Sequence, residues 1–122
     1  METTATLVEK HCTACEKPTR AFESAEVEEQ LRSLPGWRPT ADGRRIRKDW
    51  QVKDFTTGIE FFRQVAQLAE AEGHHPDLHL DDYRHVWIEL WTHAVGGLSD
   101  NDFIMAAKID HLPIQLRTHN AP

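Results

Sequence analysis

The sequence contains few cysteines, no long hydrophobic run and only one short basic stretch, Arg44, Arg45, Arg47 and Lys48, and each shortage excludes a class of protein. Two cysteines in 122 residues are too few for the disulfide framework of a small secreted protein and favour a reducing compartment. The sequence shows neither a signal peptide nor a membrane-spanning segment, so we expect a cytoplasmic protein. The net charge of −6 argues against nucleic acid or an anionic membrane as the main partner.

The two cysteines, Cys12 and Cys15, follow His11 in a Cys-x-x-Cys spacing. This spacing is typical of half a zinc site or of a redox pair, but no second pair accompanies it. We therefore interpret them as unpaired thiols in a flexible N-terminal arm, residues 1–21. Residues 22–122 are expected to form a single domain with its own hydrophobic core.

The first part of this domain is expected to contain a helix and a pair of strands. The helix runs from Ser24 to about Leu34 and is ended by Pro35-Gly36. Strands are expected over residues 37–40 and 44–52, because the Asp-Gly pair between them is a strong hairpin signal.

The longest helix is expected to follow Asp54, its N-cap, and to end at Gly73, its C-cap. Apolar residues recur along it at steps of three and four, which predicts one buried face. The residues of this expected face are Phe55, Ile59, Phe62, Val65 or Ala66, and Ala69.

The segment from His85 to His93 alternates as a strand does. Its inward set is Val86, Ile88 and Leu90, and its outward set is His85, Trp87, Glu89, Trp91 and His93. The outward tryptophans indicate that another subunit or a ligand covers that face. A last helix follows Ser99, where Ser99-x-x-Asp102 resembles a capping box. The order helix, strand, strand, helix, strand, strand, helix predicts an α+β fold, a two-layer domain with helices packed on one face of a four-stranded antiparallel sheet.

Histidine is concentrated in one segment, which is the candidate functional site. Five of the eight histidines lie between residues 70 and 102, namely His74, His75, His79, His85 and His93. His74 and His75 follow the long helix and precede Pro76, which prevents that helix from continuing. Because histidine can give and take a proton near neutral pH, the segment predicts a proton-transfer site. The carboxylates that could orient an imidazole there are Glu70, Glu72, Asp77 and Asp102.

Two other interpretations stay open on residue types alone. A zinc ion could be held by His74, His75 and His93. The four-residue spacing of His75 and His79 is that of helix-borne zinc ligands, but Pro76 makes a helix between them improbable. A structural role is the other interpretation, since surface histidines are common.

The pattern around this segment resembles the pterin-4a-carbinolamine dehydratase family, also known as the dimerization cofactor of homeodomain family. The signature of that family is an acidic residue, His-His-Pro, an aromatic residue, a later His and an Asp in the following helix. This sequence supplies Glu70, His74-His75-Pro76, Tyr83, His93 and Asp102. Gly36-Trp37, Lys53-Asp54-Phe55 and the strand-to-helix turn from Thr92 to Asp102 match as well, so the resemblance covers about residues 22–112.

The resemblance implies dehydration of a 4a-hydroxytetrahydropterin to quinonoid dihydropterin and water, which recycles a tetrahydrobiopterin-type cofactor. It implies histidine acid-base catalysis, with His74 and His93 as general acids toward the 4a-hydroxyl and His75 as a substrate-binding residue that assists as a base. The implied substrate-binding residues are Trp37, Pro76 and Asp77, and the supporting ones are Glu70, Tyr83 and Asp102. This chemistry requires no metal and no cofactor.

The resemblance also implies a homodimer or homotetramer and a functional link to an aromatic amino acid hydroxylase, with no nucleic acid or membrane as partner. A non-catalytic binding or assembly module on the same fold is the alternative, since relatives in animals also bind a homeodomain transcription factor. A metal-dependent hydrolase is a third possibility. The intact His-His-Pro and the later His93 favour the enzyme, because a non-catalytic binder would not need them.

Overall fold

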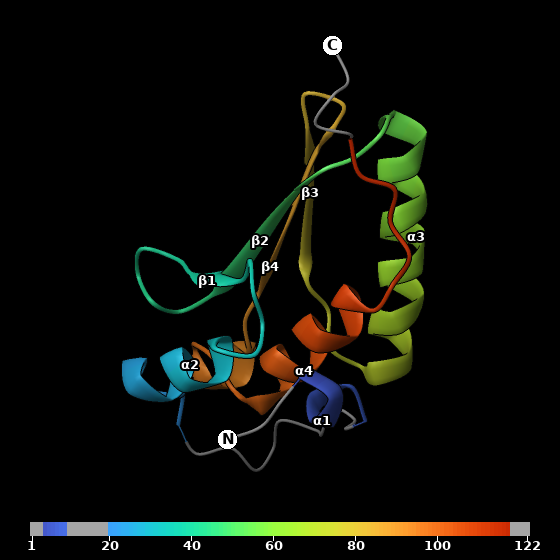
Figure 1. Ribbon diagram of the computed structural model, residues 1–122. Helices are drawn as coiled ribbons and strands as arrows, with labels where there is room; N and C mark the ends of the chain where they lie inside the picture. The colour runs from blue at the N-terminus through green and yellow to red at the C-terminus, as the bar shows by residue number, and fades with distance from the viewer. Residues whose placement is uncertain (1–3, 10–19, 118–122) are drawn as a thin grey trace.

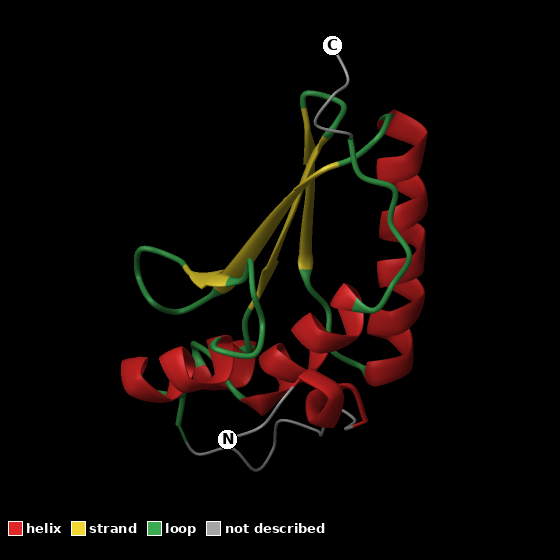
Figure 2. Ribbon diagram, in the orientation of Figure 1, coloured by secondary structure: helices red, strands yellow, loops and turns green. Residues whose placement is uncertain are grey.

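The computed structural model describes residues 4–9 and 20–117, in which four strands form one antiparallel sheet of order β1-β2-β4-β3 (Figures 1 and 2). The helices are α1 (Thr4–Glu9), α2 (Ser24–Leu31), α3 (Phe55–Glu72), the 3-10 turn η1 (His93–Val95) and α4 (Asp100–Asp110). The strands are β1 (Arg38–Pro39), β2 (Ile46–Gln51), β3 (Asp77–Asp81) and β4 (His85–Leu90). The expected α+β architecture is confirmed, and α3 and α4 pack on the same face of the sheet.

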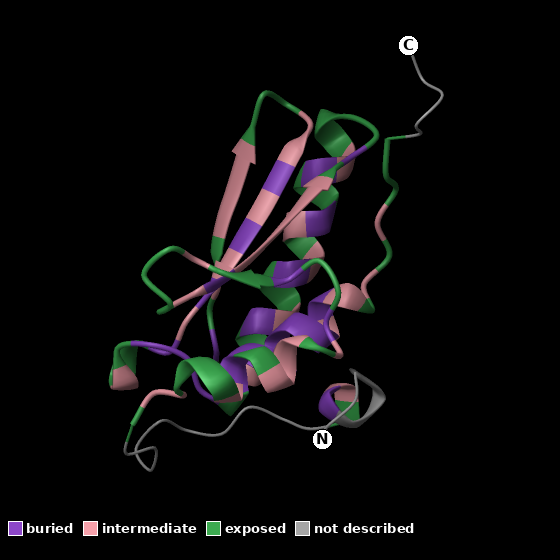
Figure 3. Ribbon diagram, turned by 60° about the vertical axis from the view of Figure 1, so that its left-hand side comes forward, coloured by how far each residue is buried: buried purple, intermediate pink, exposed green. Residues whose placement is uncertain are grey.

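The core lies between this face of the sheet and the two helices. In β4, Val86, Ile88 and Leu90 are fully buried and alternate with partly exposed residues, as the sequence pattern predicted (Figure 3). Nearly all of α4 is buried, because this helix lies between the sheet, α1 and the end of α3. The site described below is therefore held by elements that are themselves part of the core.

Both ends of α3 agree with the sequence prediction, and its buried face agrees in part, since Val65 and Ala69 are buried as expected. Asp54 caps the helix by accepting a hydrogen bond from the Thr57 backbone N–H at 2.8 Å. Gly73 ends the helix in the left-handed conformation, with a φ of 68°. Of the expected inward residues, Phe55 and Ile59 are instead 52% and 48% exposed.

The sheet, and not the sequence spacing, selects the buried face of α3. The buried residues of this helix are Gly58, Phe61, Val65 and Ala69. The sheet lies close to α3 at Gly58, where an added Cβ would lie only 3.3 Å from Leu80 of β3 and 3.4 Å from Val86 of β4. Phe55 and Ile59 lie on a different face and form an exposed apolar stripe.

Two further differences concern the N-terminal half. The N-terminal arm contains the helix α1, in which Leu7 is fully buried and the Val8 carbonyl accepts a hydrogen bond from Lys108 of α4. This part of the arm is therefore ordered against the core, whereas Cys12 and Cys15 lie outside the described residues. The first strand is shorter than expected, since only Arg38 and Pro39 pair with β2.

No helix within residues 4–9 and 20–117 is long and apolar enough to cross a membrane.

Candidate active site

The candidate site lies where the end of α3, the turn before β3, the turn after β4 and the start of α4 meet. Gly73 ends α3, and the next backbone N–H, that of His74, still bonds to the Ala69 carbonyl at 3.2 Å. Pro76 then leads the chain into β3. This sharp change of direction buries His74 and leaves His75 exposed, so adjacent histidines occupy different environments.

His74 forms the buried half of the site with Asp102 of α4. The His74 ring is 8% exposed, and its Nε2 lies 2.7 Å from Oδ1 of the fully buried Asp102. The other oxygen, Oδ2, accepts hydrogen bonds from the Thr92 hydroxyl at 2.8 Å and from the Ser99 backbone N–H at 3.0 Å. A buried carboxylate with three donors is well stabilised and holds its histidine in one orientation.

His75 forms the exposed half of the site with Glu70. Its Nε2 is hydrogen-bonded to the Glu70 carboxylate across the last turn of α3, and both side chains are largely exposed. His75, Glu70 and Pro76 border a cavity of about 240 Å³. The remaining lining residues are apolar, namely Val65, Ala66, Ala69 and Leu78. A small flat molecule bound in this cavity would have an imidazole at its edge.

His93 does not end a strand, as expected, but begins the turn η1. Strand β4 ends at Leu90, and Thr92 pairs only with Gly97 in an isolated bridge that closes the loop around η1. The exposed His93 ring meets Trp91 edge to face, with ring centroids 5.1 Å apart. Among the described residues, no hydrogen bond or ring contact joins His93 to His74 or His75.

The implied substrate-binding residues Trp37 and Asp77 already have partners within the chain. Trp37 is 4% exposed, and its indole N–H donates to the Asp110 carboxylate at 3.1 Å. Asp77 follows Pro76 directly and forms an ion pair with Arg45, with 3.0 Å between Oδ2 and the nearer guanidinium nitrogen. Neither lines the cavity beside His75.

Tyr83 lies apart from His74 and His75 in this chain. It is 52% exposed and sits in the turn between β3 and β4, at the opposite end of that hairpin from His74 and Pro76 (Figure 1). Its backbone is left-handed, with a φ of 47°, and its ring contacts Arg84. The structure thus brings His74 and Asp102 together, and His75, Glu70 and Pro76 together, but leaves Tyr83 apart.

Sequence reasoning missed Thr92 and Ser99 as site residues. Ser99 was expected only as a helix cap, and it does form a capping box with Asp102. Thr92 opens the stretch up to Asp102 that resembles the strand-to-helix turn of the family, but no residue pattern gave its hydroxyl a role. That role follows from the burial of Asp102, whose carboxylate needs several donors and whose burial is visible only in the structure.

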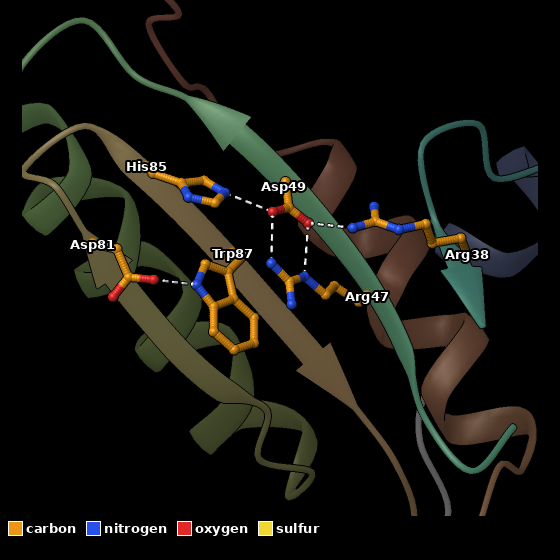
Figure 4. A network of polar contacts seen from close by, with 6 residues as sticks. All are labelled: Arg38, Arg47, Asp49, Asp81, His85 and Trp87. Carbon is orange, nitrogen blue, oxygen red and sulfur yellow. Dashed lines mark hydrogen bonds and ion pairs between the residues drawn. The ribbon is translucent and has the colours of Figure 1, made fainter. Parts of the chain in front are cut away.

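The outer face of the sheet carries a separate polar network centred on Asp49 of β2 (Figure 4). Arg47 binds the Asp49 carboxylate with two hydrogen bonds, of 2.8 and 2.9 Å. His85 and Arg38 bind it at 2.6 and 3.0 Å. The Arg47 guanidinium, assisted by His85 and Arg38, holds the pKa of the Asp49 carboxyl well below its usual range.

Neighbours from the same chain cover Trp87 on this outer face. The His79 ring of β3 stacks on it with ring centroids 3.6 Å apart, and the Arg47 guanidinium of β2 lies 3.8 Å from its centroid. The indole N–H donates to Asp81 at 2.6 Å (Figure 4). His79 and Arg47 therefore cover part of the Trp87 ring within one chain.

No group of three or more His, Cys, Asp or Glu side chains is placed to hold a metal ion in the part of the chain that the structure describes.

Comparisons with known proteins identify the family and the fold of this chain. Residues 20–112 match the family described as Pterin 4 alpha carbinolamine dehydratase. "Pterin-4-alpha-carbinolamine dehydratase 2, mitochondrial" of Arabidopsis thaliana is 46% identical over 114 residues, which are 91% of this chain but 61% of that relative. The chain thus spans less than two thirds of that relative's length. A Chlorobaculum tepidum relative, also named for this dehydratase, is 43% identical over 108 residues, which are 87% of this chain and 96% of the relative.

A solved structure has the same fold. It is described as a crystal structure of a transcriptional coactivator/pterin dehydratase from Brucella melitensis. The superposition has a TM-score of 0.68 at 36% identity and covers 75% of this chain and 96% of the other.

Proposed function

This chain belongs to the Pterin 4 alpha carbinolamine dehydratase family, and from that premise we propose that it dehydrates a 4a-hydroxytetrahydropterin to quinonoid dihydropterin and water. The observation that carries the proposal is the pair of adjacent histidines, one fixed by a buried carboxylate and the other exposed beside a cavity. The apolar walls of that cavity suit the flat ring of a pterin, and the histidine and glutamate at its edge suit the polar edge of the ring.

The proposed reaction needs one acid and one base and no change of oxidation state. The bond between C4a and the hydroxyl oxygen breaks, and the oxygen leaves as water after an acid has protonated it. A base removes the proton from N5 as the double bond between N5 and C4a forms. Histidine suits both steps, because the ordinary pKa of an imidazole side chain lies near neutral pH.

The residues proposed for these roles are those that the family signature matches. His74 and His93 act as acids toward the 4a-hydroxyl, and His75 binds the substrate and assists as a base. The burial of His74 against Asp102 supports a fixed proton donor, and the exposure of His75 at the cavity supports a binding role. Glu70 and Asp102 orient these two histidines. Trp37 and Tyr83, like His74 and His93, do not line the cavity beside His75, so the roles of these four residues rest on the family resemblance.

The proposal is tested by the loss of a 4a-hydroxytetrahydropterin in stopped flow with single alanine variants of His74, His75 and His93. Each should lower the dehydration rate by about ten- to ten-thousand-fold. The matched control is His79→Ala, since His79 stacks on Trp87 on the outer face of the sheet and lies outside the proposed site. Full activity in all three site variants would refute the proposed roles.

The finer biological role is proposed on the family resemblance alone. We propose that the reaction recycles a tetrahydrobiopterin-type cofactor for an aromatic amino acid hydroxylase. The cytoplasmic location expected from the sequence also stays a proposal, since the Arabidopsis relative is named as mitochondrial. Cell fractionation and the pterin content of cells without the gene are the direct measurements.

We also propose a homodimer or homotetramer, and the exposed apolar stripe of α3 supports it. Phe55 and Ile59 are one turn apart, and both are about half exposed. A second copy of the chain would remove this apolar surface from water. The outer sheet face, which the sequence suggested for this role, is less suited, since Trp87 is already covered by His79 and Arg47.

A binding or assembly module is the second candidate function. The Brucella melitensis protein carries both descriptions in its title, transcriptional coactivator and pterin dehydratase. The stopped-flow assay separates the two functions for this chain, because a module without catalysis would leave the dehydration rate at that of buffer.

A further inference from the structure

Thr92 is a buried residue whose hydroxyl bonds to Asp102, the carboxylate that holds His74, and to the hydroxyl of Ser99. It is 1% exposed and lies between Trp91 and His93, in the loop that the Thr92–Gly97 bridge closes. Its Oγ1 lies 2.8 Å from Oδ2 of Asp102 and 2.7 Å from Oγ of Ser99. The family resemblance gives Thr92 no role, and its side chain does not line the cavity.

The hydrogen bonds around Thr92 have one consistent direction. The Asp102 carboxylate accepts, so the single hydroxyl hydrogen of Thr92 goes to it. The hydroxyl of Ser99 must then donate to Thr92, while its oxygen accepts the backbone N–H of Asp102 in the capping box. Each hydroxyl thus gives one hydrogen bond and receives one, and the group has no alternative arrangement that leaves every partner satisfied.

This direction determines which nitrogen of His74 carries the hydrogen. Oδ2 of Asp102 takes two donors, from Thr92 and from the Ser99 backbone. The remaining oxygen, Oδ1, faces Nε2 of His74 and accepts its hydrogen at 2.7 Å. The neutral ring therefore has its hydrogen on Nε2 and its lone pair on Nδ1. No described residue forms a hydrogen bond with Nδ1.

We propose that Thr92 is a positioning residue that, through Asp102, holds His74 in the Nε2–H tautomer and so makes Nδ1 the nitrogen that exchanges a proton with the substrate. The exchange rests on the proposed dehydratase function. When Nδ1 holds a proton it gives that proton to the departing 4a-oxygen, and it regains one from water before the next turnover. Nε2 keeps its hydrogen bond to Asp102 throughout.

The direct test is the tautomer of His74 in protein labelled with ¹⁵N in its histidine rings. Two-bond and three-bond couplings between ring protons and nitrogens identify which nitrogen carries the hydrogen in neutral imidazole. We expect His74 to be in the Nε2–H form in the wild-type protein and in Thr92→Ser, which keeps the hydroxyl. Thr92→Val, which has nearly the same shape but no donor, should show a mixture of both tautomers.

Kinetics supply the second readout. Loss of such a supporting hydrogen bond should lower kcat by about ten- to 100-fold. KM should stay within about two-fold, since Thr92 does not line the cavity. Thr92→Ser should restore most of kcat, a rescue that a purely steric role would not give. The matched control is Thr56→Val on the exposed side of α3, which should change neither readout.

The two proposals fail in distinguishable ways. A wild-type His74 in the Nδ1–H form overturns the role of Thr92 whether or not the protein is active, and so does a Thr92→Val variant with unchanged tautomer and kcat. A folded wild-type protein with Nε2–H at His74 but no dehydratase activity overturns the dehydratase and leaves the tautomer assignment standing. If Thr92→Val does not fold, Ser99→Ala replaces it, since it removes the hydroxyl that orients Thr92. An unchanged His74 tautomer there would count against the chain of hydrogen bonds.

Discussion

Nε2 of His74 lies 2.7 Å from Oδ1 of Asp102, which joins the residue after the C-cap of α3 to the first turn of α4. The contact is buried, with 8% of His74 and none of Asp102 exposed. One side chain thus caps a helix through Ser99 and orients a histidine at the same time. The stability of the fold and the geometry of the site are coupled at this contact.

Replacing Asp102 by Asn should therefore lower both stability and activity. The amide has one oxygen and one NH₂ group, so it cannot accept from His74, Thr92 and Ser99 together. We expect a loss of about 1–3 kcal/mol in the free energy of unfolding, measured by urea denaturation. The dehydration rate should fall by about 100-fold or more. Asp100→Asn is the control, because Asp100 is exposed in the same helical turn, and equal effects of both variants would contradict the special position of Asp102.

Glu70→Gln should separate binding from stability. The contact between Glu70 and His75 is exposed, so its loss should change the free energy of unfolding by less than about 1 kcal/mol. If Glu70 orients His75 toward the substrate, KM should rise several-fold in steady-state dehydration assays. Glu60→Gln alters a comparable exposed contact, with Arg63, on the same helix and should leave KM unchanged. A KM equal to that of the wild type in both variants would remove Glu70 from the site.

The Asp49 network predicts a pH dependence of stability. Because Arg47, His85 and Arg38 lower the pKa of Asp49 in the folded state, the carboxylate stabilises the fold above its unfolded pKa of about 3.9. This contribution is lost as the pH falls through the lower, folded pKa. At pH 7, Asp49→Asn should reduce the free energy of unfolding by about 1–2 kcal/mol, since charge-assisted hydrogen bonds are lost.

The difference between wild type and Asp49→Asn should then shrink as the pH falls below about 4, where the unfolded carboxyl takes up its proton. Urea titrations between pH 7 and pH 3 measure it directly. Asp82→Asn is the control, because Asp82 is exposed in the turn between β3 and β4. A difference that grows toward acid pH would mean that the sign of the Asp49 shift is wrong.

The exposed stripe of α3 predicts the effect of a charge on assembly. Ile59→Glu places a carboxylate in the stripe formed by Phe55 and Ile59, and it should shift the oligomer toward the monomer in light scattering. Thr56→Glu adds the same charge on the same helix outside the stripe. A wild-type protein that is already monomeric at micromolar concentration would contradict the proposed oligomer.

Local signals in the sequence predicted those parts of the fold that local interactions determine. Asp54 and Gly73 bound α3 as expected, since a cap depends on neighbours within one turn. The alternation from Val86 to Leu90 predicted the buried face of β4, because successive side chains of a strand point to opposite faces of the sheet. The segment after Leu90 differed, because the Thr92–Gly97 bridge turns the chain into η1 before His93.

Tertiary contacts determined what the sequence did not predict. Two apolar rows run along α3, and only the close approach of Leu80 to Gly58 decides that Phe55 and Ile59 face outward. Thr92 enters the site because β4 ends beside the start of α4, which no spacing along the chain encodes.

The candidate site likewise has one part that local signals predicted and another part that tertiary contacts determine. The turn at His74 and His75 follows from Gly73 and Pro76, so it was accessible to sequence reasoning. Trp37 was implied as a wall of the pocket, but its bond to Asp110 of α4 places it in the core.

The most direct test of the central claim is the rate at which chelator-treated wild-type protein removes a 4a-hydroxytetrahydropterin in stopped flow. We expect a rate well above that of buffer, unchanged by the chelator and reduced at least ten-fold in the folded His75→Ala variant. A folded wild-type protein that leaves the substrate to decay at the rate of buffer would contradict the proposed dehydratase.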